Sequence, residues 1–414
     1  MRIVYQDVAG LDVHKKVVVA AIRVLGPDQV WQEAHRTFGT MTTDLLALSA
    51  WMLAHGVRQV AMESTGEYWK PVFNILEANF NVILVNAHQL SKVPGRKTDQ
   101  SDAQWIAELL QYGLLKASFI PPLGQRELRE LTRARSNFVR ERSNLVNRLQ
   151  KVLESANIKL ASVAADIMGV SSRAMLAALI AGTATPETMA DLAKGRMRDK
   201  REQLAKALEG RVKGHHRFTL TELLCQIDSL DDALARFDQQ IMAYGRPFEE
   251  VVALLDTIPG VARQTAEVIV AEIGIDMSQF PTAEHLAAWA GLAPGNNESA
   301  GRNRSGKTRK GDRALRSALT QAAQAAAHTQ GTYLAAQFHR IAARRGKKRA
   351  IVAVAHSILV IAYHLIQKRE PYHDLGGNYF DKRDAETTKQ RLVTRLEKLG
   401  YHVALQAQPA AASA

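Results

Sequence analysis

Four acidic residues in the first quarter of the chain have the types and spacing of a metal site: Asp12, Glu63, Asp99 and Asp102. Asp12 and Glu63 each stand where a predicted strand ends. Asp99 and Asp102 are three residues apart at the start of a predicted helix, so both can project from one face. Carboxylate oxygens suit Mg²⁺ or Mn²⁺. Two such ions about 3.5–4 Å apart can activate the attacking oxygen and stabilise the leaving oxygen in phosphoryl transfer.

Each acid also has a simpler explanation when it is taken alone. Asp99 could cap the helix, Asp102 could favour the helix dipole, and Glu63 could be a solvated turn residue. The combination of four acids at the ends of these elements favours the metal site. His14 and Lys15 follow Asp12 and could approach a phosphate, but a solvated surface explains them equally well.

The elements that must position these acids alternate between strand and helix. Hydrophobic periodicity predicts strands over 8–13, 17–24, 30–37, 57–62 and 82–86, and helices over 43–55, 71–78 and 99–112. This order is that of an α/β ribonuclease-H-like domain, in which helices flank a mixed sheet. The strands that carry Asp12 and Glu63 are neighbours in such a sheet, so their carboxylates can converge. The consecutive prolines at 121 and 122 place the end of this domain at residue 121.

A long helical region is predicted over 122–245. From Leu128 to Val152, apolar residues recur in alternating steps of three and four, the spacing of a coiled-coil seam. Arg135 and Arg142 fall at core positions of that seam and make it imperfect. The helix could pack within its own domain or pair between subunits, and the spacing leaves both open.

A mainly α C-terminal domain is predicted over 246–372. It comprises a helix–turn–helix over 254–274 and helices over 312–328, 332–345 and 348–368, followed by a partly disordered tail over 373–414. The turn at Pro259 and Gly260 resembles a helix-hairpin-helix, whose backbone N–H groups could hold a phosphate. An ordinary turn between helices explains it equally well.

The charge balance favours a polyanionic partner. The chain carries 54 Lys and Arg against 41 Asp and Glu, a net charge of +13, which suits DNA or RNA. One dense cluster, opposed by Asp312, could grip phosphates or form a solvated face. Its members are Arg302, Arg304, Lys307, Arg309, Lys310, Arg313 and Arg316.

The remaining bulk features narrow the class of protein. The single cysteine, Cys225, excludes an intrachain disulfide and a multi-cysteine zinc site, and its apolar neighbours predict a core position. No apolar run approaches the roughly 20 residues of a membrane span. The longest, over 350–365, is interrupted by polar residues. We therefore expect no membrane partner and a cytoplasmic, nucleoid-associated protein.

Several short motifs, in this order and spacing, resemble the IS110/IS1111 family of insertion-sequence transposases. They are Gly10-Leu11-Asp12-Val13-His14-Lys15, Glu63-Ser64-Thr65-Gly66-Glu67-Tyr68-Trp69-Lys70-Pro71, Pro94-Gly95-Arg96-Lys97-Thr98-Asp99-Gln100-Ser101-Asp102-Ala103, Ile258-Pro259-Gly260-Val261, Gly291-Leu292-Ala293-Pro294 and Lys310-Gly311-Asp312-Arg313-Ala314-Leu315-Arg316. Together they span roughly residues 8 to 370. Each motif is short, but the set in this order is specific.

The resemblance implies a RuvC-like N-terminal domain with an Asp-Glu-Asp-Asp site at Asp12, Glu63, Asp99 and Asp102, with Mg²⁺ as cofactor. It also implies a coiled-coil segment and a C-terminal transposase domain that supplies a catalytic serine. Members form homo-oligomers, dimers or tetramers, in which two half-sites come from different subunits. They act on element ends and target DNA with a structured non-coding bridge RNA, through strand exchange.

The family serine follows the Gly-Leu-x-Pro motif, which points here to Ser299, with Ser305 as the competitor. A serine in such a loop is ordinarily a turn residue. As a nucleophile it would need activation by the metal site or by nearby cations, and it would leave a phosphoserine-linked DNA strand.

Three functions therefore compete. The leading expectation is a transposase and site-specific DNA recombinase that uses Mg²⁺-assisted serine attack, guided by RNA. The alternative is a metal-dependent RuvC-like endonuclease of the junction-resolvase type, with water as nucleophile. A catalytically silent nucleic-acid-binding protein is the third, and the intact acidic quartet argues against it. The fold alone cannot separate the first two, although a nuclease has no need of the second basic domain.

Overall fold

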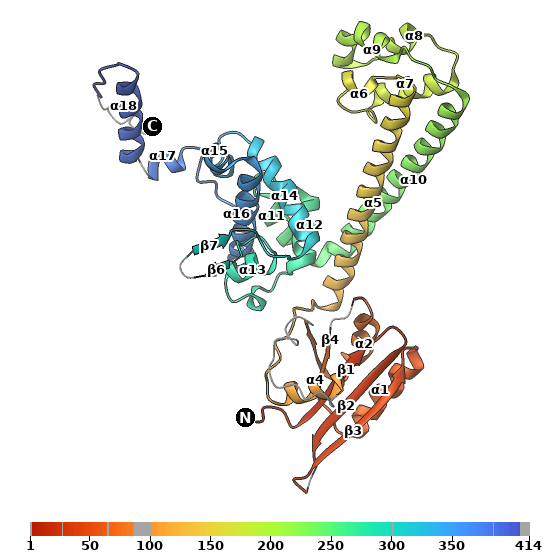
Figure 1. The fold of residues 1–414 in the computed structure, drawn as a ribbon, viewed down its shortest axis with the longest axis vertical. Coiled ribbons are helices and arrows are strands. Elements are labelled where there is room, and N and C mark those ends of the chain that lie inside the picture. The colour runs from red at the N-terminus through yellow and green to blue at the C-terminus, as the bar shows by residue number, and fades with distance from the viewer. Residues whose placement is uncertain are drawn as a thin grey trace. The chain divides into compact units, whose positions relative to one another are not determined.

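A computed structural model describes residues 2–26, 28–63, 66–86, 101–295, 297–299, 302–383 and 385–405. Only the backbone is described for residues 297–299 and 302–305. The chain divides into two compact units, Met1–Ile120 and Pro121–Ala414 (Figure 1). Each unit is described by itself below.

The first unit is built on a five-stranded mixed sheet. Its strands are β1 (Asp7–Val13), β2 (Val17–Leu25), β3 (Trp31–Gly39), β4 (Gln59–Glu63) and β5 (Asn81–Val85), in the order β3-β2-β1-β4-β5. The first three strands are antiparallel neighbours, whereas β4 runs parallel to β1 and β5 parallel to β4. The predicted α/β ribonuclease-H-like fold is thereby confirmed for this unit.

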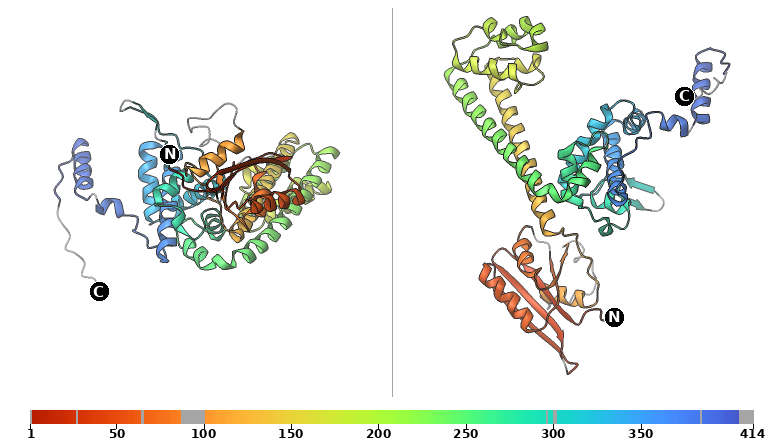
Figure 2. Two further views of the ribbon diagram at one scale, coloured as in Figure 1. Left: turned by 90° about the horizontal axis from the view of Figure 1, so that it is seen from below. Right: turned by 180° about the vertical axis from the view of Figure 1, so that it is seen from behind.

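Helices cover both faces of the sheet. Helices α1 (Thr42–Ala54) and α2 (Trp69–Leu76) pack on one face, and α4 (Asp102–Gln111) packs on the other (Figure 2). Successive side chains of a strand point to opposite faces. Accordingly Leu11 and Val13 join the core beneath α1 and α2, and Val8 joins the core beneath α4.

The second unit starts with two long antiparallel helices, α5 (Leu123–Ser155) and α10 (Gly214–Gly245), which pack against each other. The predicted seam of α5 therefore contacts a helix of the same chain. Its two seam arginines are satisfied by acids of α10: Arg135 Nε lies 2.5 Å from Asp238 Oδ1, and Arg142 pairs with Asp231. Between them Phe138 meets Phe237, with ring centroids 5.1 Å apart. In the middle of the helix pair, two ion pairs flanking one aromatic pair thus take the place of a continuous apolar seam.

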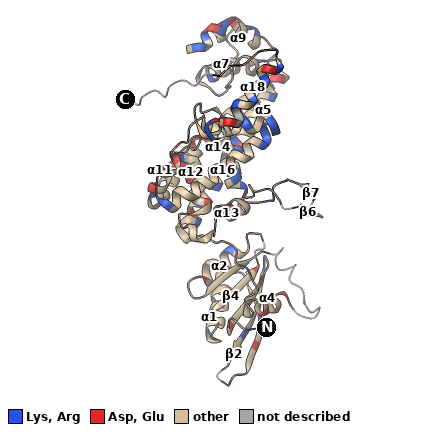
Figure 3. Ribbon diagram, turned by 90° about the vertical axis from the view of Figure 1, so that its left-hand side faces the viewer, with Lys and Arg blue, Asp and Glu red and all other residues tan. Residues whose placement is uncertain are grey.

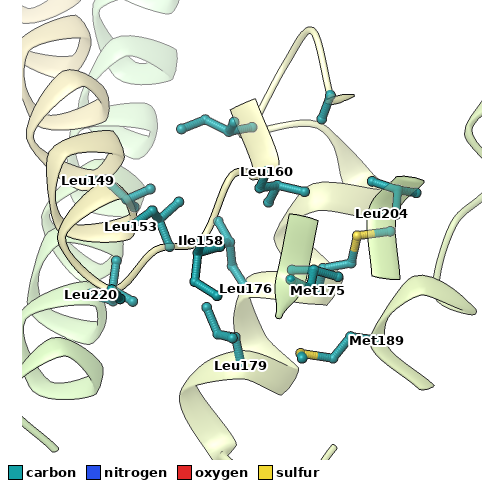
Figure 4. Packing of buried hydrophobic residues seen from close by; sticks show 14 of the residues in the cluster. Leu149, Leu153, Ile158, Leu160, Met175, Leu176, Leu179, Met189, Leu204 and Leu220 are labelled. Atoms are coloured by element: carbon teal, nitrogen blue, oxygen red, sulfur yellow. The ribbon is translucent and has the colours of Figure 1, made fainter. Parts of the chain in front are cut away.

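A helical cap closes the far end of this helix pair. It consists of α6 (Leu160–Val163), α7 (Val170–Ala181), α8 (Pro186–Ala190), the 3₁₀ helix η1 (Gly195–Lys200) and α9 (Arg201–Leu208). The cap has its own core: Leu149 and Leu153 of α5 and Leu220 of α10 pack with Leu176 of α7 and Leu204 of α9 (Figure 4). Lys and Arg residues, drawn in blue in Figure 3, are spread over this cap and along α5.

A C-terminal helical body follows α10. Its elements are η2 (Arg246–Phe248), α11 (Glu249–Asp256), α12 (Arg263–Ile273), η3 (Met277–Gln279), α13 (Ala283–Trp289), β6 (Asn297–Ser299), β7 (Arg302–Ser305), α14 (Arg313–His328), α15 (Tyr333–Arg345) and α16 (Lys347–Lys368). By length and composition α16 could cross a membrane, but half of its apolar window is buried inside the protein. It contacts α11, α13, α14 and α15, and is therefore the core helix of this body.

Two details differ from the sequence predictions. Cys225 is exposed on α10 rather than part of a core, because its neighbours Leu223 and Ile227 are the residues that face inward. The helix predicted from Asp99 begins at Asp102. The region predicted as a partly disordered tail contains α17 (Tyr379–Arg383) and α18 (Ala385–Lys398). Residues 406–414 lie outside the described part, so the prediction of partial disorder stays a prediction.

Candidate active site

Asp12 and Glu63 lie side by side on the face of the sheet that α4 covers. In β4, Met62 belongs to the core beneath α1 and α2, and Ala61 to the core beneath α4, so Glu63 points to the α4 face. Asp12 shares that face because Leu11 and Val13 point the other way. The parallel pairing of β1 and β4 matches Leu11 with Met62, and the next step in this register brings Asp12 beside Glu63. Neighbouring strands are about 4.8 Å apart.

The start of α4 brings a third acid to this edge. Ser101 caps the helix: the backbone N–H of Gln104 donates to Ser101 Oγ at 3.3 Å, and the backbone N–H of Ser101 donates to Gln104 Oε1 at 3.0 Å. This capping box fixes the first turn, whose first residue is Asp102. The sequence analysis missed Ser101 as the cap, although a Ser-x-x-Gln pattern signals one.

Gly10 sets how closely α4 approaches the sheet. A Cβ at this position would lie 2.2 Å from the carbonyl oxygen of Ala103 and 2.4 Å from the backbone nitrogen of Ala107. Both alanines are fully buried and stand one turn apart on the inner face of α4. A glycine opposite two alanines thus lets the helix lie directly on β1, with Asp102 at its end.

The three carboxylates interact electrostatically. Partial burial of Glu63 raises the pKa of its carboxyl group, and the charges of Asp12 and Asp102 raise it further, while His14 acts in the opposite sense. His14 Nε2 lies 3.0 Å from Asp12 Oδ2. Like charges in one site disfavour ionisation, so these three acids form one coupled group.

The donor chemistry of this group fits a divalent cation, because oxygen ligands and mutual repulsion are what such an ion would satisfy. The fourth acid, Asp99, lies outside the described residues. Within the described ranges, no three His, Cys, Asp or Glu side chains stand close enough together to hold a metal ion. The described acids are therefore gathered at one edge without converging on a single point.

Ser299 lies in the second unit, on a two-stranded hairpin rather than in the expected loop. Strands β6 and β7 pair antiparallel, with Ser299 matched to Arg302 beside the turn and Asn297 matched to Ser305 nearer the base. The two candidate serines therefore stand at different heights on the hairpin. The side chains of Ser299, Ser305, Arg302 and Arg304 lie outside the described part.

The foot of this hairpin is anchored to the helical body. The backbone N–H of Gly295 donates to the carbonyl oxygen of Lys307 at 3.0 Å. Gly291, with a φ of +71°, sits so close to Gly311 that a Cβ would lie 2.7 Å from the Gly311 nitrogen. Arg316 Nη2 donates to Thr308 Oγ1 at 3.0 Å. The Gly-Leu-Ala-Pro and Lys-Gly-Asp motifs are thus the two sides of one backbone contact.

The predicted basic cluster surrounds this foot. Lys307, Arg309, Lys310 and Arg313 are exposed there, as a phosphate-binding surface requires. Asp312 does not simply oppose them: it caps α14 by accepting from the backbone N–H of Leu315 at 2.8 Å and accepts from Arg133 Nη2 at 2.7 Å.

A buried ionic network on α5 and α12 was not predicted from the sequence. Glu272 is fully buried, and Arg133 Nε and Arg129 Nε lie 2.7 and 3.1 Å from its carboxylate oxygens. Arg129 also donates to the carbonyl oxygens of Ala271 and Glu272 at 3.1 and 2.6 Å, closing the C-terminal end of α12. Burial raises the pKa of the Glu272 carboxyl, whereas the hydrogen bond from Arg133 lowers it. An i, i+4 arginine pair on α5 was the available signal.

The Pro259–Gly260 turn serves packing. Gly260 has a φ of +86°, and a Cβ there would lie 2.4 Å from the carbonyl oxygen of Ala322 and 2.5 Å from the nitrogen of Ala326. The turn therefore rests directly on α14. This contact favours the ordinary helix turn over a phosphate-binding hairpin at Gly260 itself.

Comparisons with known proteins match both units. A family model described as "Transposase" matches residues 9–158, and one described as "Transposase IS116/IS110/IS902 family" matches residues 252–340. The chain is 27% identical over 273 residues to a probable family 20 transposase of Pseudomonas aeruginosa, covering 64% of this chain and 70% of the relative. It is 25% identical to the transposase for insertion sequence element IS1111A of Coxiella burnetii, covering 69% and 71%. It is 34% identical over 149 residues to a pilin gene-inverting protein of Moraxella bovis, covering 34% and 45%.

The ribonuclease-H-like sheet, the acids at its edge and these matches define the chain as a DNA transposase, an enzyme of DNA recombination. The two family models lie in the expected order on the chain. The protein belongs to the IS110 family of insertion-sequence transposases.

Proposed function

We propose that this transposase cuts and rejoins DNA by phosphoryl transfer at a site where Asp12, Glu63, Asp99 and Asp102 hold Mg²⁺ or Mn²⁺ and Ser299 is the nucleophile. The proposed metal site is supported by the gathering of Asp12, Glu63 and Asp102 at one edge of the sheet. The pKa of the Glu63 carboxyl group is raised by partial burial and by the charges of the other two acids. A bound divalent cation supplies charge stabilisation to the phosphoryl group in such sites.

The chain's own residues have distinct tasks in this scheme. The backbone positions of Asp12 and Glu63 are set by their strands, and that of Asp102 by the capping box of α4. Binding of the cation would draw their carboxylates together. His14, which contacts Asp12 at 3.0 Å, holds that carboxylate in one orientation. Glu63 must be ionised to act as a ligand, and its raised pKa means that a cation competes with a proton for it.

The serine half rests on the family resemblance and is supported by the hairpin. The Ser299 hydroxyl oxygen forms a bond to phosphorus and releases its proton, while a phosphodiester P–O bond breaks and the departing oxygen takes up a proton. The phosphate-ester energy is kept in the phosphoserine link, which a DNA hydroxyl can later attack to rejoin a strand. The exposed cations at the foot of the hairpin would hold the DNA strand beside it.

Guidance by a structured RNA and assembly into a homo-oligomer complete the proposal, and both rest on the resemblance. The net charge of +13 supports two nucleic-acid partners. Among the features of the described residues, none reads bases in the manner of a recognition helix, which agrees with the choice of sequence being left to an RNA.

The test incubates the full chain with Mg²⁺, element-end DNA and RNA transcribed from the element, and looks for a covalent protein–DNA adduct on a denaturing gel. We expect an adduct with the wild type and with Ser305→Ala, and a loss of at least about 10³-fold with Ser299→Ala or Asp12→Asn. An adduct that survives Ser299→Ala but not Ser305→Ala would move the nucleophile to Ser305.

The alternative, a metal-dependent endonuclease of the junction-resolvase type, gives a different result in the same experiment. Water attacks in that mechanism, so DNA is cut without any adduct, and Ser299→Ala cuts as well as the wild type. The expected outcome remains the adduct, because the family resemblance implies a catalytic serine in this segment.

A further inference from the structure

Helices α5, α12 and α14, which are labelled in Figure 1, line a groove in the second unit. The groove has a volume of about 610 Å³, and its mainly polar lining comes from the middle of α5 and from the N-terminal parts of α12 and α14. Arginines at 133, 135, 140 and 313 line it, with glutamines at 264 and 321. Among these residues, only Arg313 was predicted from the sequence to contact nucleic acid.

The groove has a surplus of positive charge. Arg133 is matched by Glu272 and Asp312, and Arg135 by Asp238. Asp312, which also lines the groove, is thereby neutralised. Among the described residues, no carboxylate pairs with Arg140 or Arg313, and both are exposed. The guanidinium groups of Arg140 and Arg313 are therefore available to bind an anionic ligand.

Backbone donors add to this surplus. The N-cap of α12, Ala262, has no side chain that could accept a hydrogen bond from the first turn, and Gln264 and Thr265 of that turn line the groove. The first N–H groups of a helix have no partner within it and carry partial positive charge. Gln264 and Thr265 line the same groove as Arg140 and Arg313, so a phosphate there could accept from these N–H groups and from the arginines.

The lining also indicates the form of the ligand. None of the described residues that line the groove is aromatic, whereas proteins that hold single strands stack bases on aromatic rings. Cations and N–H groups without aromatic rings suit the sugar–phosphate backbone of a duplex. The lining includes Asp312 and Arg313 at the start of α14, the next helix after the serine hairpin.

We propose that this groove is a binding site for the backbone of a nucleic-acid duplex, held by Arg140, Arg313 and the first turn of α12. The inference rests on the proposed function for its nucleic-acid substrate, but it concerns binding and not chemistry. DNA and RNA duplexes share the phosphodiester chemistry, and the experiment separates them.

The test uses two near-isosteric substitutions on α14. Gln321 lines the groove, whereas Gln324 is exposed on the same helix outside it. Each is changed to Glu in the full chain carrying Asp12→Asn, so that no cutting disturbs the measurement. Binding to a short DNA duplex, an RNA duplex of the same sequence and the single DNA strand is measured by anisotropy over a range of salt concentrations. We expect Gln321→Glu to weaken duplex binding about three- to tenfold at low salt, and Gln324→Glu to have little effect.

The double variant Arg140→Gln/Arg313→Gln tests the cations. Each phosphate contact contributes about 0.9 to the slope of log affinity against log salt, so the slope should fall by about 2. The matched control removes two exposed cations elsewhere on the helix pair, Lys151→Gln/Arg236→Gln. An effect on the DNA duplex alone assigns the groove to DNA, an effect on the RNA duplex alone assigns it to RNA, and an equal effect on both assigns it to the phosphodiester backbone that the two duplexes share.

Equal effects of the groove and control variants, no effect on any probe, or an effect confined to the single strand would each overturn the proposal. Failure of the serine mechanism is visible separately, because it changes adduct formation in the chain with Asp12 intact. Binding in the Asp12→Asn background is unaffected by which group is the nucleophile.

Discussion

Replacing Gly10 by alanine should damage the acidic site without touching an acid. The new Cβ would meet the Ala103 carbonyl oxygen at 2.2 Å, whereas ordinary contacts begin near 3.4 Å, so α4 must retreat by about 1 Å. Asp102 is the first residue of that helix and would move with it. Misplacing one ligand by such a distance should weaken binding of the metal about 10- to 100-fold, while the overpacking costs about 1–3 kcal/mol of stability.

The assay is a Mn²⁺ titration of the full chain followed by electron paramagnetic resonance, with Asp12→Asn defining the signal that belongs to the site. Leu48→Ala is the control, because Leu48 is fully buried on α1, beneath the opposite face of the sheet. It should cost about 2–5 kcal/mol and leave Mn²⁺ affinity unchanged. The reasoning is refuted if Gly10→Ala binds Mn²⁺ like the wild type, or if Leu48→Ala weakens binding as much.

Two further predictions concern acids in different environments. Glu272→Gln should lower the free energy of unfolding by about 3 kcal/mol, because it removes the buried carboxylate that pairs with Arg129 and Arg133. Glu249→Gln breaks an exposed pair with Arg263 and should cost less than about 1 kcal/mol in the same urea titration. Similar costs for the two variants would contradict the role of the buried network. The raised pKa of Glu63 means that the folded state binds its proton more readily than the unfolded chain, so its contribution to stability is present below the ordinary pKa of 4.5 and is lost as pH rises through the folded value. In EDTA at neutral pH, Glu63→Gln should therefore have a higher melting temperature than the wild type, by about 4 °C for each kcal/mol of stability. The difference should vanish at acidic pH, and Mg²⁺ should stabilise only the wild type. A lower melting temperature for the variant at neutral pH would contradict the repulsion between Glu63 and its neighbouring carboxylates.

The sequence was sufficient for the first unit because its elements are long and strongly periodic. Strands such as Val17–Leu25 are continuous apolar, valine-rich runs whose central residues are buried. The placement of Asp12 and Glu63 at neighbouring strand ends followed from the order of elements alone. The close approach of α4 did not, because it depends on Gly10 meeting Ala103 and Ala107, which are far apart in the sequence.

The second unit was harder because its partners are distant and its elements short. The arginines of the α5 seam made sense only with Asp231 and Asp238, about a hundred residues downstream. The cap went unpredicted because helices such as α6, with four residues, give too few turns for a periodic pattern. Strands β6 and β7 are short and polar, so neither hydrophobic alternation nor a standard turn dipeptide indicated a hairpin.

The ion pairs between α5 and α10 also fix the register of the two helices, that is, how far one can slide along the other. Sliding one helix along the other by a single turn would carry each arginine about 5.4 Å from its acid, and no second acid stands in register to receive Arg135 and Arg142 together among the described residues. An all-leucine seam would tolerate such a slip far better. The 33 residues of α5 therefore act as a ruler of about 50 Å. Insertions or deletions of one helical turn in only one of the two helices should therefore destabilise the helix pair, whereas matched changes in both helices should be tolerated.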